Sequence, residues 1–154
     1  MRINFYEAIQ SKDGRTVLVK EKTVNYETGK LNSAENIVLM MHKLLNIGRM
    51  AEEHCYMIGM NSTGKILGIF FISKGTVNNS LITPREVYMR ALLIGAVQII
   101  LCHNHPSGNV LPSNTDTKLT QKIKEAGEML YINLADHIVI GKDSYFSFKE
   151  AKML

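Results

Sequence analysis

Apolar and polar positions along the chain alternate in blocks of strand or helix length. The first thirty residues are polar and strand-like, and Arg15–Lys22 has an apolar centre between polar flanks. Two apolar segments, Cys55–Met60 and Ile66–Ser73, flank the turn-forming residues Asn61–Gly64, and this order predicts a β-hairpin. Val97–Cys102 is an almost continuous apolar run, which indicates a strand that is covered on both faces.

Two helices are predicted from capping residues that precede apolar positions. Ser33 is a favourable N-cap for a helix that runs to about Leu45 and is ended by Gly48. Thr83-Pro84-Arg85-Glu86 has the pattern of a capping box and starts a helix that stops near Gly95.

The last third of the chain predicts one more helix and a second hairpin. Ser113 opens a helix that reaches Leu130. Ile138–Ile140 and Ser144–Phe148 are strand-like and flank the turn residues Gly141–Asp143. Strands and helices that alternate in this way predict an α/β fold, a central mixed sheet with helices on it.

The domain prediction follows from length and from the lack of any repeat, linker or low-complexity segment. We expect one domain over residues 1–154, with a core of about 33–150 and a short strand-like N-terminal extension, 1–32.

Composition adds less than the pattern does. Hydrophobic residues make up 45% of the chain and charged residues 21%, as in ordinary globular enzymes. No secretory signal or long uncharged apolar run is visible, so we expect a cytoplasmic protein with no membrane segment. Cys55 and Cys102 are too few for a disulfide framework, and we expect free thiols that fill strand positions.

One segment, from Leu101 to Asp116, holds the residues that point to chemistry. His103 and His105 stand two apart at the end of the predicted buried strand, so in extended backbone both side chains point to the same side. Ser113 and Asp116 stand three apart at a helix start and share one face of that helix. Two histidines and a carboxylate, with one position left for water, are typical of catalytic zinc sites.

Other interpretations of these residues stay open at this point. His103 and His105 could be polar loop residues just beyond a strand. Ser113 and Asp116 could form only a capping pair, because serine at the N-cap with an acid three residues later explains itself. Two histidines and a carboxylate also suit a redox-active iron.

The order His-x-His-Pro, a short spacer, and Ser-x-x-Asp resembles the JAMM motif of the JAB/MPN metalloproteases. The surrounding sequence is similar to the RadC-like branch of that superfamily from about Ser33 to Glu150. The matching segments are Thr83–Val87, His103–Gly108, Pro112-Ser113 and Asp136–Gly141. The resemblance implies an MPN/JAB-like (cytidine-deaminase-like) fold, in which helices sandwich a mixed β-sheet.

The resemblance also implies a function and its residues. His103, His105 and Asp116 would bind Zn²⁺, and Ser113 would donate a hydrogen bond to the substrate carbonyl or oxyanion. The implied activity is hydrolysis of an amide, in a peptide or isopeptide bond, by a metal-activated water.

The family's general acid/base is a glutamate just before the first hairpin strand. Matching Glu-His-Cys-Tyr-Met-Ile to that strand selects Glu53, which is expected to lie outside the metal's own ligands. Glu52 is the fallback, because a slip of one residue would exchange the two. Glu86 is also acidic, but its place in the capping box accounts for it.

The implied partner is a peptide or protein substrate, and a ubiquitin-like protein is one option. The alternative function is a RadC-type, DNA-repair-associated protein that binds nucleic acid and has a non-catalytic metal site. RadC-like proteins often have an N-terminal helix-hairpin-helix region, whereas this N-terminus is short and strand-like. With a net charge of +4, we expect duplex binding to be weak and lost at physiological salt.

The remaining histidines are expected to have supporting roles. His137 is expected to be structural or to support a ligand, His42 to lie at the surface of a helix, and His54 to point away from Glu53. The polar residues Asn78–Ser80 could line a substrate groove or form an ordinary loop.

Overall fold

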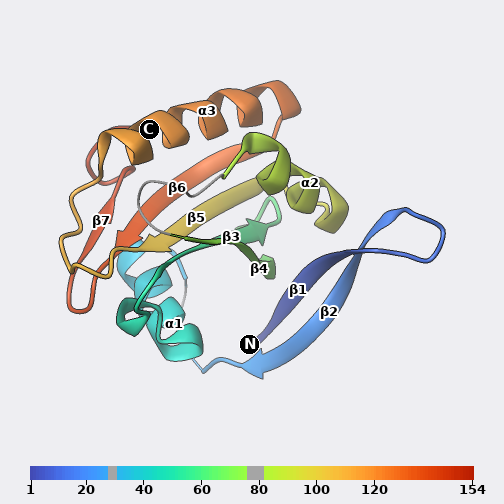
Figure 1. The fold of residues 1–154 in the computed structure, drawn as a ribbon, viewed down its shortest axis with the longest axis horizontal. Coiled ribbons are helices and arrows are strands. Elements are labelled where there is room, and N and C mark those ends of the chain that lie inside the picture. The colour runs from blue at the N-terminus through green and yellow to red at the C-terminus, as the bar shows by residue number, and fades with distance from the viewer. Residues whose placement is uncertain (28–30, 76–81) are drawn as a thin grey trace.

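The computed structural model describes residues 1–27, 31–75 and 82–154, which fold around one mixed β-sheet (Figure 1). Within these ranges the sheet has seven strands in the order β2-β1-β4-β3-β5-β6-β7. The strands are β1 (Arg2–Gln10), β2 (Thr16–Asn25), β3 (Glu53–Met60), β4 (Ile66–Gly75), β5 (Gln98–Asn104), β6 (Asn133–Ile140) and β7 (Tyr145–Ser147). Neighbours are antiparallel except β1–β4 and β5–β6, which are parallel.

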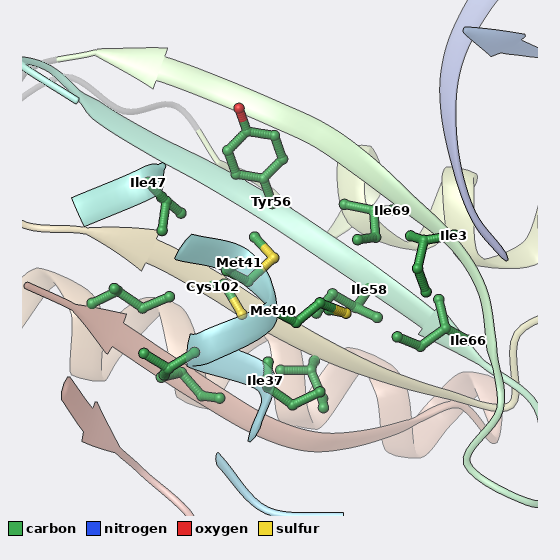
Figure 2. Close-up of a cluster of buried hydrophobic side chains, with 14 of the residues drawn as sticks. Ile3, Ile37, Met40, Met41, Ile47, Tyr56, Ile58, Ile66, Ile69 and Cys102 are labelled. Atoms are coloured by element: carbon green, nitrogen blue, oxygen red, sulfur yellow. The ribbon is translucent and has the colours of Figure 1, made fainter. Parts of the chain in front are cut away.

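Helices cover both faces of this sheet (Figure 1). They are α1 (Ala34–Leu45), α2 (Pro84–Ile94) and α3 (Asn114–Leu130), with a short 3-10 helix, η1 (Ile47–Arg49). One apolar cluster packs α1 against the sheet and includes Met40, Ile58 and Cys102 (Figure 2). A second cluster lies under α2 and α3 and includes Leu101 and Ile123. The predicted α/β sandwich is confirmed.

The prediction for the apolar run at 97–102 is confirmed, because β5 is buried on both faces. Ile99 and Leu101 belong to the cluster under α2 and α3, whereas Ile100 and Cys102 belong to the α1 cluster. The strand continues through Asn104, two residues beyond the apolar run, so His103 lies in extended backbone.

Helix α1 begins and ends where predicted, but Asn46 and not Gly48 terminates it. The Ser33 side chain accepts a hydrogen bond from the Asn36 N–H, as an N-cap does. The helix stops at Asn46, which adopts the left-handed conformation (φ 53°), and Gly48 lies in η1. Asparagine tolerates this conformation better than most residues, so the glycine is not needed as the stop signal. Beside Gly48 lies His42, which is partly exposed on α1.

Helix α2 has only half of the predicted capping box. The Thr83 hydroxyl accepts from the Glu86 N–H. The Glu86 carboxylate, in contrast, pairs with the guanidinium groups of Arg85 and Arg90. Arginine supplies strong, charge-assisted donors, which explains why the carboxylate lies there. The helix ends at Gly95, as predicted.

The predicted N-terminal extension is a hairpin of β1 and β2 that reaches away from the rest of the sheet (Figure 1). It joins the sheet through a short parallel contact of Phe5 and Tyr6 with β4. No helix in the described ranges is long and apolar enough to cross a membrane. The predicted loop residues Asn78–Ser80 lie outside the described residues.

Candidate metal centre

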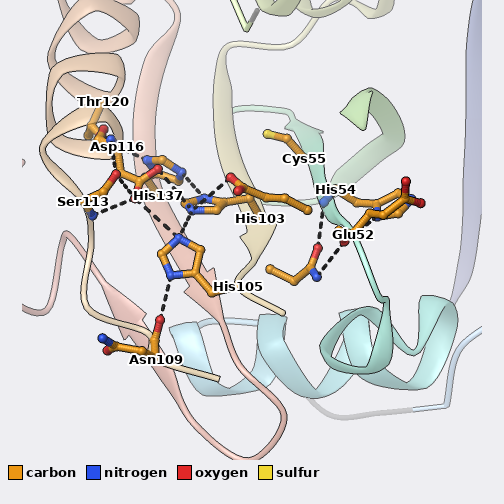
Figure 3. Close-up of polar contacts among 12 residues, drawn as sticks. Glu52, His54, Cys55, His103, His105, Asn109, Ser113, Asp116, Thr120 and His137 are labelled. Atoms are coloured by element: carbon orange, nitrogen blue, oxygen red, sulfur yellow. Dashed lines mark hydrogen bonds and ion pairs between the residues drawn. The ribbon is translucent and has the colours of Figure 1, made fainter. Parts of the chain in front are cut away.

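Three segments that are distant in sequence meet where β5 ends. Strands β3 and β5 are antiparallel, and Cys55 pairs with His103, so the start of β3 lies beside the end of β5. The first turn of α3 lies over the same edge of the sheet (Figure 3). Glu53, His103, His105 and Asp116 converge there, with one ligand atom of each within 4.8 Å of the others.

The two histidines and Asp116 form the inner part of this group. The Nε2 atoms of His103 and His105 are 3.1 Å apart. Asp116 Oδ1 is 3.3 Å from His103 Nε2, and its Oδ2 is 3.5 Å from His105 Nε2. The three side chains are only 3–11% exposed. Imidazole nitrogens and carboxylate oxygens are typical ligands of Zn²⁺, so the donor set fits a divalent cation.

Glu53, and not Glu52, faces this group. Its Oε1 is 4.0 Å from His103 Nε2, and its Oε2 is buried with no hydrogen-bond partner in the described structure. Burial, opposed by the nearby His103, raises the pKa of Glu53. Glu52 is half exposed and forms a salt bridge of 2.5 Å with Lys74. A buried carboxylate with a raised pKa is suited to proton transfer.

Asp116 takes part in both the capping and the cluster. Its Oδ2 accepts hydrogen bonds from the Ser113 N–H and hydroxyl, both at 2.7 Å, and the Ser113 oxygen accepts from the Asp116 N–H. The helix cap and the possible ligand are therefore the same residue. Burial alone would raise the pKa of Asp116, but the hydrogen bonds with His103 and His105 outweigh burial and hold the pKa well below its usual value.

The loop after β5 orients His105. Its Nδ1 lies 2.7 Å from the Asn109 carbonyl oxygen, which can only accept, so Nδ1 carries a hydrogen. Neutral His105 thus presents the Nε2 lone pair to the cluster. The hydrogen bond with Asp116, opposed by burial, raises the pKa of His105.

His137 lies behind His103 and outside the group of possible ligands. Its Nε2 is 2.8 Å from His103 Nδ1, and its Nδ1 is 2.6 Å from the Thr120 hydroxyl oxygen. The His137 ring is fully buried and stacks on Phe148. Burial, reinforced by His103, lowers the pKa of His137 well below its usual value. Sequence reasoning missed Thr120, although its position four residues after Asp116 puts both on one face of α3.

Asn104 is the second residue that sequence reasoning missed. It is 1% exposed, and its side chain bonds the backbone on both sides of Glu53. Oδ1 accepts from the His54 N–H at 2.8 Å, and Nδ2 donates to the Glu52 carbonyl at 3.1 Å. The available signal was strand parity, because a residue between two inward histidines must point to the opposite, buried face.

A cavity of about 380 Å³ opens beside the cluster. Both Glu53 and His105 line it, together with apolar side chains that include Pro106 and Leu111. A substrate that lies in this cavity would therefore contact the cluster directly. Both cysteines are buried free thiols, as expected from the sequence.

Comparison with known proteins points consistently to one family. The family model of the RadC-like JAB domain matches residues 31–153. The chain is 39% identical over 131 residues to a UPF0758 protein of Clostridium acetobutylicum, covering 84% of this chain and 56% of the relative. A UPF0758 protein of Chlorobaculum parvum is 41% identical over 104 residues, covering 68% and 47%. The chain spans about half the length of the curated relatives it matches.

Proposed function

The chain belongs to the RadC-like JAB domain family, and we propose that it is a zinc-dependent hydrolase that cleaves a peptide or isopeptide bond. The observation that carries the proposal is the convergence of Glu53, His103, His105 and Asp116 within 4.8 Å. His103, His105 and Asp116 would hold the metal. When bound, zinc acts as a Lewis acid and activates water near neutral pH.

Glu53 would move the protons of the reaction. It accepts a proton from the attacking water and returns it to the leaving amine, as general acid–base catalysis requires. Its raised pKa and its position in both the cluster and the cavity lining support this role. Ser113 would donate a hydrogen bond to the oxyanion, for which its hydroxyl must turn away from Asp116.

We propose a peptide or protein as the substrate, with a ubiquitin-like protein as one option. The mostly apolar cavity beside the cluster supports a peptide segment, since apolar side chains line it together with the carboxylate of Glu53 and the imidazole of His105. A purely nucleic-acid-binding role would need neither a metal site of His103, His105 and Asp116 nor Glu53 beside it. We therefore rank that role second.

The metal part of the proposal is tested by elemental analysis of freshly purified protein. We expect about one zinc per chain, because His103, His105 and Asp116 are the three protein ligands that a single catalytic zinc site needs. His103→Ala and Asp116→Ala should each lose most of it, because each removes one of three ligands. Protein that holds no zinc and takes up none on addition would rule out the zinc-dependent mechanism.

The catalytic part is tested by a matched pair of variants, Glu53→Gln and Glu52→Gln, on a peptide and isopeptide panel. Glutamine keeps size and hydrogen bonding but accepts no proton, so Glu53→Gln should keep its zinc and lose about 10²–10⁴-fold in rate. Glu52→Gln should keep a kcat near that of the parent, because Glu52 lines the cavity but pairs with Lys74 and contributes no atom to the cluster. Zinc loss in Glu53→Gln would make Glu53 a ligand instead of a base.

A further inference from the structure

A row of hydrogen bonds runs from His103 into the protein interior. His103 Nδ1 contacts His137 Nε2 at 2.8 Å, and His137 Nδ1 contacts the Thr120 hydroxyl at 2.6 Å. The Thr120 hydroxyl donates to the Asp116 carbonyl at 2.7 Å. Figure 3 shows these side chains behind the cluster, between β5, β6 and α3.

The end of this row sets the direction of every bond in it. A carbonyl oxygen only accepts, so the single hydrogen of the Thr120 hydroxyl lies toward Asp116. The Thr120 oxygen must then accept from His137 Nδ1–H. A neutral His137 that donates through Nδ1 can only accept through Nε2, so it takes its hydrogen bond from His103 Nδ1–H.

We propose that Thr120 and His137 are positioning residues that fix His103 in the tautomer whose Nε2 lone pair faces the metal centre. This inference rests on the proposed metal-binding function and extends it to two residues outside the ligand set. The burial of Thr120 and His137, 2% and 0% exposed, keeps water from offering alternative partners.

The two histidines of the cluster are thus oriented by different means. His105 donates to the Asn109 carbonyl oxygen. A carbonyl oxygen cannot donate, so the direction of this hydrogen bond is fixed. His103 donates to an imidazole, which could equally act as a donor. Only Thr120 and the carbonyl behind it exclude that reversal. Asp116 therefore serves the centre twice, through its carboxylate and through its backbone oxygen.

The first test is the tautomer of each ring in zinc-free protein, where no metal imposes it. Two-bond ¹H–¹⁵N spectra at alkaline pH report which ring nitrogen carries hydrogen. We expect His103 and His137 both to be protonated at Nδ1. Hydrogen at Nε2 of His137 would reverse the row and overturn the proposal. This readout does not depend on whether the protein hydrolyses anything.

The second test compares Thr120→Val with Thr120→Ser by competition with a chromophoric zinc chelator. Valine keeps the shape but cannot accept from His137, so zinc affinity should fall about 10–100-fold, the usual effect of losing a ligand's supporting partner. Serine keeps the hydroxyl and should stay near the parent. Equal affinity of the valine variant and the parent would overturn the proposal. A parent that binds no zinc would instead contradict the proposed function, while the spectra still decide the tautomer.

Discussion

The Ser113 hydroxyl has two tasks that compete for one hydrogen. In the structure this hydrogen points to Asp116 Oδ2, while the Ser113 oxygen accepts from the Asp116 N–H. Both bonds stabilise the first turn of α3 and hold the carboxylate against the histidines. Donation to a substrate oxyanion requires the hydroxyl to rotate, which leaves the Asp116 Oδ2 bonded to the Ser113 N–H.

Ser113→Ala and Ser113→Thr separate these tasks. Alanine removes the cap, so the free energy of unfolding should fall by about 1 kcal/mol. If the hydroxyl serves the oxyanion, the hydrolysis rate at full zinc occupancy should also fall about 10²–10³-fold. Threonine keeps the hydroxyl and should retain most of the stability and most of the hydrolysis rate. Denaturant unfolding and kcat measured on the same preparations check this, and unchanged kcat in Ser113→Ala would leave only the capping role.

At the scale of elements, Asn104 links the end of β5 to the segment that leads into β3. Its side chain bonds the backbone of Glu52 and His54, the neighbours of Glu53 on either side. It therefore holds Glu53 in register with the histidines, although its own side chain lies on the opposite face of the sheet.

Asn104→Ala should affect catalysis more than metal binding. It leaves the partly buried His54 N–H without its partner, so the free energy of unfolding should fall by about 1–3 kcal/mol. Zinc content should stay near the parent, because no proposed ligand changes, whereas kcat should fall as Glu53 becomes less well positioned. Asn133→Ala, at an exposed strand position, is the control and should change neither the zinc content nor kcat. Parallel losses of zinc and activity would show that Asn104 supports the histidines instead.

Local chemistry explains which of these elements the sequence could predict. Ser33 and Ser113 are strong N-caps whose effect is confined to one turn, and the helices begin after them as expected. The proximity of Glu53 to His103 depends on the register of β3 against β5, which no local pattern specifies. Family resemblance supplied that pairing. Asn104 was missed because its partners lie in another segment, and Thr120 was missed because His137 lies on another element, β6.

At the scale of the whole molecule, folding shifts the pKa values of residues in the cluster, so the stability of the fold depends on pH. A raised pKa in the folded state means that protonated His105 stabilises the metal-free fold fully below about pH 6.5. This contribution is lost as pH rises through the raised pKa. Asp116 has the opposite sign, because its pKa is lowered: its contribution is complete above about pH 3.9 and is lost only in stronger acid. Near neutral pH, the His105 proton therefore competes with a cation.

Zinc should consequently stabilise the protein more at high pH than at low pH. A bound cation raises the midpoint of thermal unfolding in proportion to the logarithm of its affinity, and that affinity increases as His105 loses its proton. We expect the difference in Tm between zinc-loaded and chelator-treated protein to grow from about pH 5.5 to about pH 8.5, across the His105 pKa. His54→Gln should show the same growth, because the His54 ring bonds the Glu52 carbonyl outside the cluster. A difference that stays constant over this range would mean that no histidine proton is displaced, and the ligand set would have to exclude His105.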